Sequence, residues 1–136
     1  MNIENSLLIM FRELSRHGVY ASEQFFYDIE KLVKTDVNKF IKDFTRDFMR
    51  SNLKEYKKYE RLKLTKIQNK RLNGNALFRY EYRNNSNLRC IYMVKSVNNN
   101  NETYLLCAFN EDGGKKTGKN SYNFNIERAI KIYESN

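Results

Sequence analysis

The amino-acid sequence predicts an α+β fold, in which N-terminal helices pack on a small antiparallel β-sheet (a meander) and a C-terminal helix closes the chain. Three observations predict it. Apolar residues recur at helical spacing over the first 60 residues, the period shifts towards two from about residue 62, and helical spacing returns after residue 120. The chain has 136 residues, 40% of them hydrophobic, which is enough for one core. We therefore expect a single domain over residues 1–136, with a helical part at 1–60 and a sheet part at 61–136.

The first third of the chain is expected to form three helices. Apolar residues recur three and four positions apart over residues 7–14, 25–33 and 37–48, which is the spacing of one buried helix face. The first helix is expected to end at His17-Gly18, Ser22 to cap the second, and Thr35 or Asp36 to cap the third. The pattern predicts no strand in this part of the chain.

One face of the third helix is expected to lie in solvent. It carries both signs of charge, from Lys39, Lys42, Asp43, Arg46 and Asp47, and such a mixture is typical of an exposed face. The aromatic residues of the opposite face are expected to pack in the core and not to hold a cofactor.

A meander of at least three antiparallel strands is expected from about residue 62. Leu62 and Leu64 alternate with basic residues, and residues 77–83 alternate aromatic with charged side chains. Two further β-rich runs cover residues 88–97 and 103–109, and asparagine-rich turn formers separate the runs. A loop rich in Gly and Lys then leads to the closing helix, which Asn123 or Asn125 can cap.

The positive charge of the chain is concentrated in its middle third. The formal net charge is +9. Residues 51–100 hold twelve basic and three acidic side chains, whereas residues 1–50 hold eight of each and residues 101–136 five of each. This asymmetry predicts a surface that binds a polyanion, because neutralising phosphates releases condensed counterions. RNA is the expected partner, and a membrane is not, since the basic third lacks an amphipathic basic helix.

Other features exclude several classes of function. No apolar stretch is long enough to cross a bilayer, and the first residues lack the pattern of a secretory signal, so we expect a cytoplasmic protein. Cys90 and Cys107 lack the spacing of a zinc site and are expected to be buried thiols. His17, the only histidine, is expected at the surface, where no catalytic triad can be built around it. We expect neither a metal nor a cofactor.

A charged strand face supplies the candidate catalytic centre. In the run over residues 78–83, a period of two places Glu81 between Arg79 and Arg83, and the following hairpin can bring Arg89 beside them. A carboxylate among cations suits phosphodiester cleavage, in which a base takes the proton of the attacking hydroxyl and cations stabilise the charge on the phosphorus oxygens. A surface ion pair of little energetic weight is the alternative.

The loop over residues 113–120 is a second candidate phosphate contact. It has the G-x-x-x-x-G-K spacing of a P-loop, but Asn120 stands where that motif needs Ser or Thr, and no βαβ unit surrounds it. We therefore expect a basic loop that contacts phosphate, not a nucleotide triphosphatase. Tyr122 follows Lys116 and Lys119, and it is the tyrosine most suited to a role in a site, with core packing as the alternative.

The order and spacing of these segments resemble the RelE/ParE superfamily, whose RelE-, YoeB- and HigB-like members are endoribonuclease toxins of toxin–antitoxin pairs. The resemblance covers about residues 70–133, and about sixty helical residues precede it. The matching segments are Arg71-Leu72-Asn73-Gly74, the strands at 78–83 and 87–92, the basic pair Lys115-Lys116, Tyr122 six residues after Lys116, and the helix at 126–131.

The resemblance implies a RelE-like fold over residues 61–136 and a toxin that cuts ribosome-bound mRNA by attack of a 2′-hydroxyl, without a metal. It implies a general base at Glu81, stabilisation of the transition state by Arg89 and Lys116, and a role for Tyr122 in orienting a base or assisting the leaving group. The remaining cations would bind RNA, namely Arg71, Arg79, Arg83, Lys115 and Lys119. The implied protein partner is a cognate antitoxin.

Two alternatives to this function stay open. One is a non-enzymatic inhibitor, phage-encoded for example, that occupies RNA or a nucleoprotein complex with the same basic sheet face. The other is inhibition of gyrase, because one fold can host unrelated activities.

Overall fold

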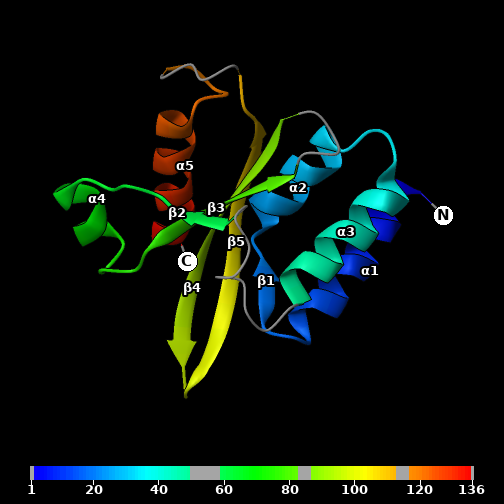
Figure 1. The fold of residues 1–136 in the computed structure, drawn as a ribbon, viewed down its shortest axis with the longest axis horizontal. Coiled ribbons are helices and arrows are strands. Elements are labelled where there is room, and N and C mark those ends of the chain that lie inside the picture. The colour runs from blue at the N-terminus through cyan, green and yellow to red at the C-terminus, as the bar shows by residue number, and fades with distance from the viewer. Residues whose placement is uncertain (1, 50–58, 83–86, 113–116, 136) are drawn as a thin grey trace.

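The computed structural model describes residues 2–49, 59–82, 87–112 and 117–135. These residues form an α+β fold, as predicted, and Figure 1 shows a central sheet with helices on both sides. Along the chain the elements are α1 (Ile3–Ser15), β1 (Val19–Ala21), α2 (Glu23–Leu32), α3 (Val37–Met49), β2 (Tyr59–Arg61), α4 (Lys66–Arg71), β3 (Leu77–Tyr82), β4 (Leu88–Val97), β5 (Asn100–Asn110) and α5 (Tyr122–Glu134).

The sheet has five strands in the order β1-β5-β4-β3-β2. The predicted meander is confirmed in β3, β4 and β5, which pair antiparallel in sequence. Asn98 and Asn99 join β4 to β5, and both adopt positive φ angles of 51° and 68°, as a tight hairpin turn requires. The sheet as a whole is mixed, because β1 pairs parallel to β5 at one edge. At the other edge β2 pairs antiparallel to β3.

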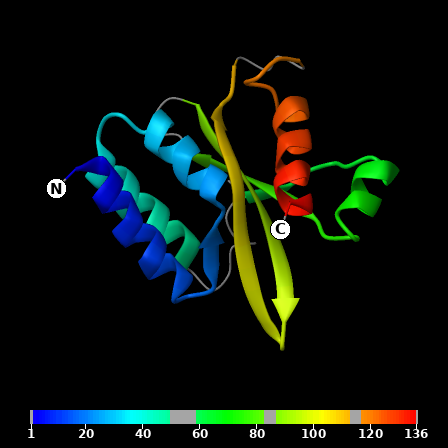
Figure 2. The ribbon, with the colours of Figure 1, turned by 180° about the vertical axis from the view of Figure 1, so that it is seen from behind.

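Helices cover both faces of the sheet, whereas the pattern predicts them on one. Figures 1 and 2 place α1, α2 and α3 on one side of the strands and α5 on the other. The alternation along β3 explains the two layers. Tyr80 and Tyr82 belong to the core shared with α1–α3, and Leu77 belongs to a second core shared with Ile126 and Ile130 of α5.

The N-terminal helices form where their periodicity and caps predict them. The Ser22 hydroxyl accepts a hydrogen bond from the backbone N–H of Phe25 and caps α2, as predicted. The helix α3 begins at Val37, directly after Asp36, whose φ of 51° is not the extended backbone of an N-cap. His17 lies at the surface, as expected, with its Nε2 3.6 Å from Glu13 Oε1. The closing helix differs from the prediction. Its cap is Ser121, and Asn125 lies buried inside the helix.

Three short elements contradict the sequence-based expectation. The strand β1 lies within the part predicted to hold none, and β2 begins at Tyr59, inside the predicted helical part. Residues 62–65 form no strand, although Leu62 and Leu64 alternate with basic residues. They lead into α4, where Thr65 and Gln68 form a reciprocal capping box.

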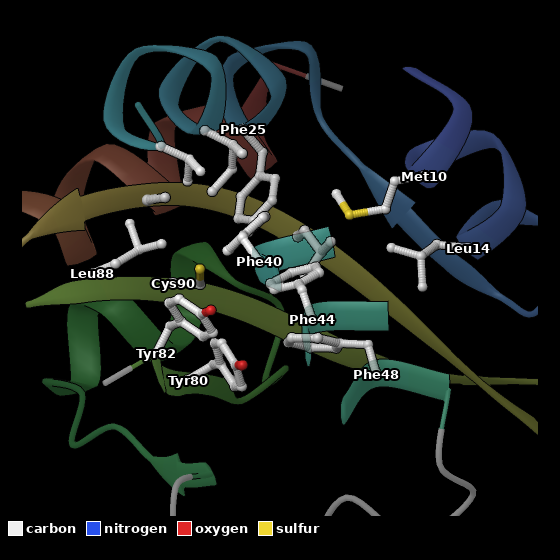
Figure 3. Close-up of a cluster of buried hydrophobic side chains, with 14 of the residues drawn as sticks. Met10, Leu14, Phe25, Phe40, Phe44, Phe48, Tyr80, Tyr82, Leu88 and Cys90 are labelled. Carbon is white, nitrogen blue, oxygen red and sulfur yellow. The ribbon is translucent and has the colours of Figure 1, made fainter. Parts of the chain in front are cut away.

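The mixed charges of α3 predict a face that lies in solvent, but part of this face is buried. Asp43 and Asp47 are buried, with 5% and 3% of their surface exposed. Asp47 Oδ2 accepts a hydrogen bond of 2.7 Å from the Tyr80 hydroxyl, and Asp43 Oδ2 accepts one of 2.9 Å from Tyr82. Figure 3 shows both tyrosines beside the phenylalanines of α3. Buried carboxylates are tolerated here because the phenol groups donate to them and because Lys39 and Arg46 form ion pairs with them.

Beyond the residues of β5 that pair with β1, side chains form hydrogen bonds with the backbone at the edge of this strand. Asp28 of α2 accepts a hydrogen bond of 2.9 Å from the Ala108 backbone N–H. Arg128 of α5 donates to the Asp28 carboxylate and, at 3.4 Å, to the Ala108 carbonyl. The two helix layers are therefore joined across an edge whose backbone groups would otherwise be open to another strand.

Candidate functional site

Four of the predicted site residues lie together at one end of the sheet, on the face that α5 covers. Arg79 and Glu81 project from β3 on the opposite face to Tyr80 and Tyr82. Arg89 lies directly opposite Glu81, because the β3–β4 pairing places these two residues in register. Tyr122 is the first residue of α5. We call Arg79, Glu81, Arg89 and Tyr122 the Glu81 cluster.

The centre of the cluster is a carboxylate between two guanidinium groups. Glu81 Oε1 lies 3.6 Å from Arg79 Nη2 and 3.9 Å from Arg89 Nε. The side chains of Glu81 and Arg89 are each 12% exposed. This placement shields the pairs from water, so their charges interact more strongly than those of surface pairs.

Two further carboxylates complete the ion pairs, and the sequence analysis missed both. Glu60 of β2 is bonded to Arg79, and Glu111 Oε2 lies 3.6 Å from Arg89 Nε. Glu60 is brought there by its register opposite Arg79 in the β2–β3 ladder, and Glu111 directly follows β5. If β2 had been predicted from the sequence, Glu60 could have been predicted as a partner of Arg79. Three carboxylates thus meet two guanidiniums, and the described part of this face is not the basic strip that the strand pattern predicts.

Tyr122 lies against this network, half-buried. Its ring contacts Phe109 edge-on at a centroid distance of 5.0 Å, and Arg79 Cζ lies 5.5 Å from the ring centroid. Burial raises the pKa of the Tyr122 phenol to about 12, although the positive charge of Arg79 opposes the shift. The phenol is therefore protonated at neutral pH and is able to donate a hydrogen bond.

Three buried polar atoms of this region have no hydrogen-bond partner among the described residues. They are Arg89 Nε, Glu111 Oε2 and the Tyr122 hydroxyl. Buried polar atoms are usually satisfied. Arg89 Nε and Glu111 Oε2 attract each other at 3.6 Å without hydrogen-bond geometry. Chemically, the region offers two donors and one acceptor to a polar ligand.

The remaining predicted residues do not join the cluster. Arg71 lies on α4, and its guanidinium bonds to Glu127 at 2.5 Å and to Glu134 at 2.6 Å, so it ties α4 to α5. Lys119 is exposed in the segment before α5. The other predicted site residues fall outside the described residues, namely Arg83, Lys115 and Lys116.

Other candidate features carry no site chemistry. Cys90 and Cys107 are free and buried, as predicted. Within the described ranges, no group of three or more His, Cys, Asp or Glu side chains is placed to hold a metal ion. A hollow between α1 and α3, lined by residues such as Ile3 and Lys39, contains no predicted site residue. None of the helices in the described ranges combines the length and the apolar character that a bilayer crossing needs.

Comparison with known proteins adds no relative to this picture. No protein-family model matches the chain. No curated protein matches it, and no solved structure does so either. What the Glu81 cluster does must therefore be inferred from its own geometry.

Proposed function

We propose that the protein is an endoribonuclease of the toxin type, held in check by an antitoxin, and that the Glu81 cluster cleaves RNA. The observation that supports this proposal is the convergence of Arg79, Glu81, Arg89 and Tyr122, which come from three elements and span 43 positions of the sequence. A carboxylate, two guanidiniums and a protonated phenol can supply the general base, the positive charge and the proton donor that phosphodiester cleavage by a neighbouring hydroxyl uses.

In the proposed reaction, Glu81 accepts the proton of the 2′-hydroxyl while the 2′-oxygen attacks the adjacent phosphorus. The bond from phosphorus to the 5′-oxygen breaks, leaving a 2′,3′-cyclic phosphate and a 5′-hydroxyl. Arg89 and Arg79 stabilise the charge that develops on the phosphorus oxygens. Tyr122 transfers its phenolic proton to the leaving 5′-oxygen and regains a proton from solvent as Glu81 releases the one that it took, and Lys116 adds positive charge.

Substrate binding has to rearrange the ion pairs of the cluster. A phosphate accepts paired hydrogen bonds from a guanidinium in the same way as a carboxylate. The RNA phosphate would therefore replace Glu60 on Arg79 and Glu111 on Arg89. Glu60 is the easier of the two to displace, since its side chain is 60% exposed. Displacement would leave Glu81 as the carboxylate nearest the scissile group.

The test is cleavage of mRNA by the purified protein in a reaction with translating ribosomes. We expect cut message with the wild type. Loss of the general base in Glu81→Gln should lower the rate about 10²–10⁴-fold. Glu60→Gln is the matched control, because it removes a carboxylate from the same network without removing the proposed base, and it should retain cleavage. Intact message with stoichiometric wild-type protein, or equal cleavage by Glu81→Gln, would refute the proposal.

A non-enzymatic RNA-binding inhibitor is the second candidate function. The observation that favours it is the pairing of both guanidiniums with carboxylates, because these carboxylates already occupy the cations that would have to stabilise the phosphorus oxygens during cleavage. This function predicts inhibited translation with uncut message, and inhibition by Glu81→Gln equal to that of the wild type. The assay described above separates the two candidates directly.

A further inference from the structure

Within the described residues, a segment of exposed cations lies outside the Glu81 cluster, over residues 61–70, and we call it the basic arm. Its ten residues contain four cations and no acidic residue. All four cations are exposed, and none forms an ion pair with another described residue. They are Arg61, Lys63, Lys66 and Lys70. The excess charge of the middle third is therefore available to a partner here, whereas at the Glu81 cluster carboxylates already occupy it.

The local structure turns these cations outward. Leu62 and Leu64 pack against the core under α5, whereas Arg61 and Lys63, which alternate with them, are exposed. Lys66 and Lys70 are four residues apart on α4 and share one side of the helix. Lys66 and Lys70 are therefore about 6 Å apart along the helix axis, from the rise per residue of an α-helix.

The basic arm is held in place although none of the residues of α4 is buried. Arg71, at the end of α4, bonds to two glutamates of α5. Asn73 donates a hydrogen bond of 2.7 Å to the Tyr133 hydroxyl, and Leu72 is fully buried. Figures 1 and 2 show α4 projecting from the body of the molecule beside α5. Anchoring of this kind lowers the entropy lost when a ligand binds.

One apolar side chain stands among the cations. Ile67 is 73% exposed, the highest value among the exposed large hydrophobic residues. The bases of a single strand are unstacked and accessible to an exposed side chain, whereas a duplex buries the base faces in its stack. Cations flanking an exposed apolar residue therefore fit a single-stranded nucleic acid better than a duplex.

We propose that the basic arm is the surface that binds the sugar–phosphate backbone of single-stranded RNA, with Ile67 against a base. This inference rests on the proposed RNA substrate and deepens it. Binding and cleavage are assigned to different surfaces, so that the arm holds the strand while the Glu81 cluster acts on it.

The test is the binding of a fluorescein-labelled oligouridine with 2′-O-methyl riboses, which lacks the attacking hydroxyl and stays uncut. Fluorescence anisotropy gives its affinity as a function of salt concentration. The variant replaces Arg61, Lys63, Lys66 and Lys70 by Gln. The matched control replaces one arginine and three lysines that are also exposed and lie on the N-terminal helices or next to them, namely Arg12, Lys31, Lys34 and Lys42.

We expect the arm variant to lose on the order of a hundredfold or more in affinity at low salt. The slope of log affinity against log salt should fall by about 2.8, since each phosphate contact with a single strand contributes about 0.7. The control variant, with the same net charge, should stay within a fewfold of the wild type. Circular dichroism of both variants checks that they are folded.

Each other outcome decides a specific point. Equal losses of affinity in the two variants would show that binding depends on net charge alone and would overturn the arm as the binding surface. Equal or tighter binding of the annealed duplex, or of the corresponding single-stranded DNA, would overturn the assignment to single-stranded RNA. Binding that follows the arm while mRNA remains uncut by the wild type would refute the proposed nuclease and keep the inference. If the arm variant bound the oligonucleotide with unchanged affinity and cut mRNA as well as the wild type does, the inference would be refuted and the proposed nuclease would stand.

Discussion

The hydrogen bond between Tyr80 and Asp47 should be one of the larger single contributions to the stability of the fold. The substitution that tests it is Tyr80→Phe, which removes one hydroxyl and keeps the ring. Tyr80 is fully buried, Asp47 is 3% exposed, and the hydroxyl is 2.7 Å from the carboxylate oxygen. A hydrogen bond to a charged group contributes about 1.5–3 kcal/mol, and water cannot replace this donor in the folded state. We therefore expect a loss of about 2 kcal/mol in the free energy of unfolding.

The measurement is unfolding in urea, followed by far-ultraviolet circular dichroism. A lower midpoint with an unchanged dependence on denaturant identifies a loss of stability. Tyr27→Phe is the control, because this tyrosine is 51% exposed and its hydroxyl bonds to Glu23 at the surface. It should leave the free energy of unfolding unchanged within the error of the experiment.

A double-mutant cycle with Asp47→Ala isolates the interaction from the loss of packing. Asp47→Ala leaves the Tyr80 hydroxyl buried without this acceptor, which itself costs about 1–3 kcal/mol. The double variant should be less destabilised than the sum of the single variants by about 1 kcal/mol or more. Additive effects, or a change below about 0.5 kcal/mol in Tyr80→Phe, a size typical of surface substitutions, would show that the buried carboxylate does not depend on this tyrosine.

Three further predictions follow from groups elsewhere in the structure. The hydrogen bond from Arg71 holds the pKa of Glu134 below its ordinary value of 4.5, so the tie between α4 and α5 is present above that pH and is lost as the pH falls through the lowered pKa. Acid should therefore lower the protection of the α4 amides, measured as their exchange rate relative to an unstructured peptide at the same pH, and Glu134→Gln should show the lower protection already at neutral pH. Burial raises the pKa of Cys107 to about 12 and that of Cys90 well above its usual range, so a disulfide reagent should modify neither thiol in the native protein and both in urea. Asp28→Ala should cost about 2–4 kcal/mol in urea unfolding, because it leaves Arg128 unpaired and the edge of β5 open; an unchanged midpoint would contradict this role.

The sequence predicts the meander and the longer helices because their periods are local properties. The alternation over Leu77–Tyr82 and the helical spacing over Val37–Met49 each repeat several times within one element. The strands β1 and β2 have three residues each, which is too few for a period to register. They exist because longer strands, β5 and β3, offer them an edge to pair with.

The burial and pairing of several charged residues could not be predicted from the sequence either, because their partners are distant along the chain. Asp43 and Asp47 are buried because tyrosines 39 and 33 positions later supply their hydrogen bonds. Arg71 is bonded to glutamates 56 and 63 positions later, so it braces α4 against α5. Glu81 and Arg89 could be paired from sequence because a short hairpin fixes their register.

Net charge therefore says less about ligand binding than the pairing of each cation does. The middle third holds the whole of the excess charge. Apart from Lys95, which lies over the rings of Tyr104 and Tyr133, its described cations nevertheless divide into two groups once partners are assigned. Arg71, Arg79 and Arg89 face carboxylates, and removing one of them leaves a carboxylate without its partner, which lowers stability. The four cations of the basic arm face water, and removing them lowers only the affinity for a polyanion and its salt dependence. Stability and RNA affinity should consequently respond to different substitutions within the same third of the chain, which a sequence-level charge count treats as one surface.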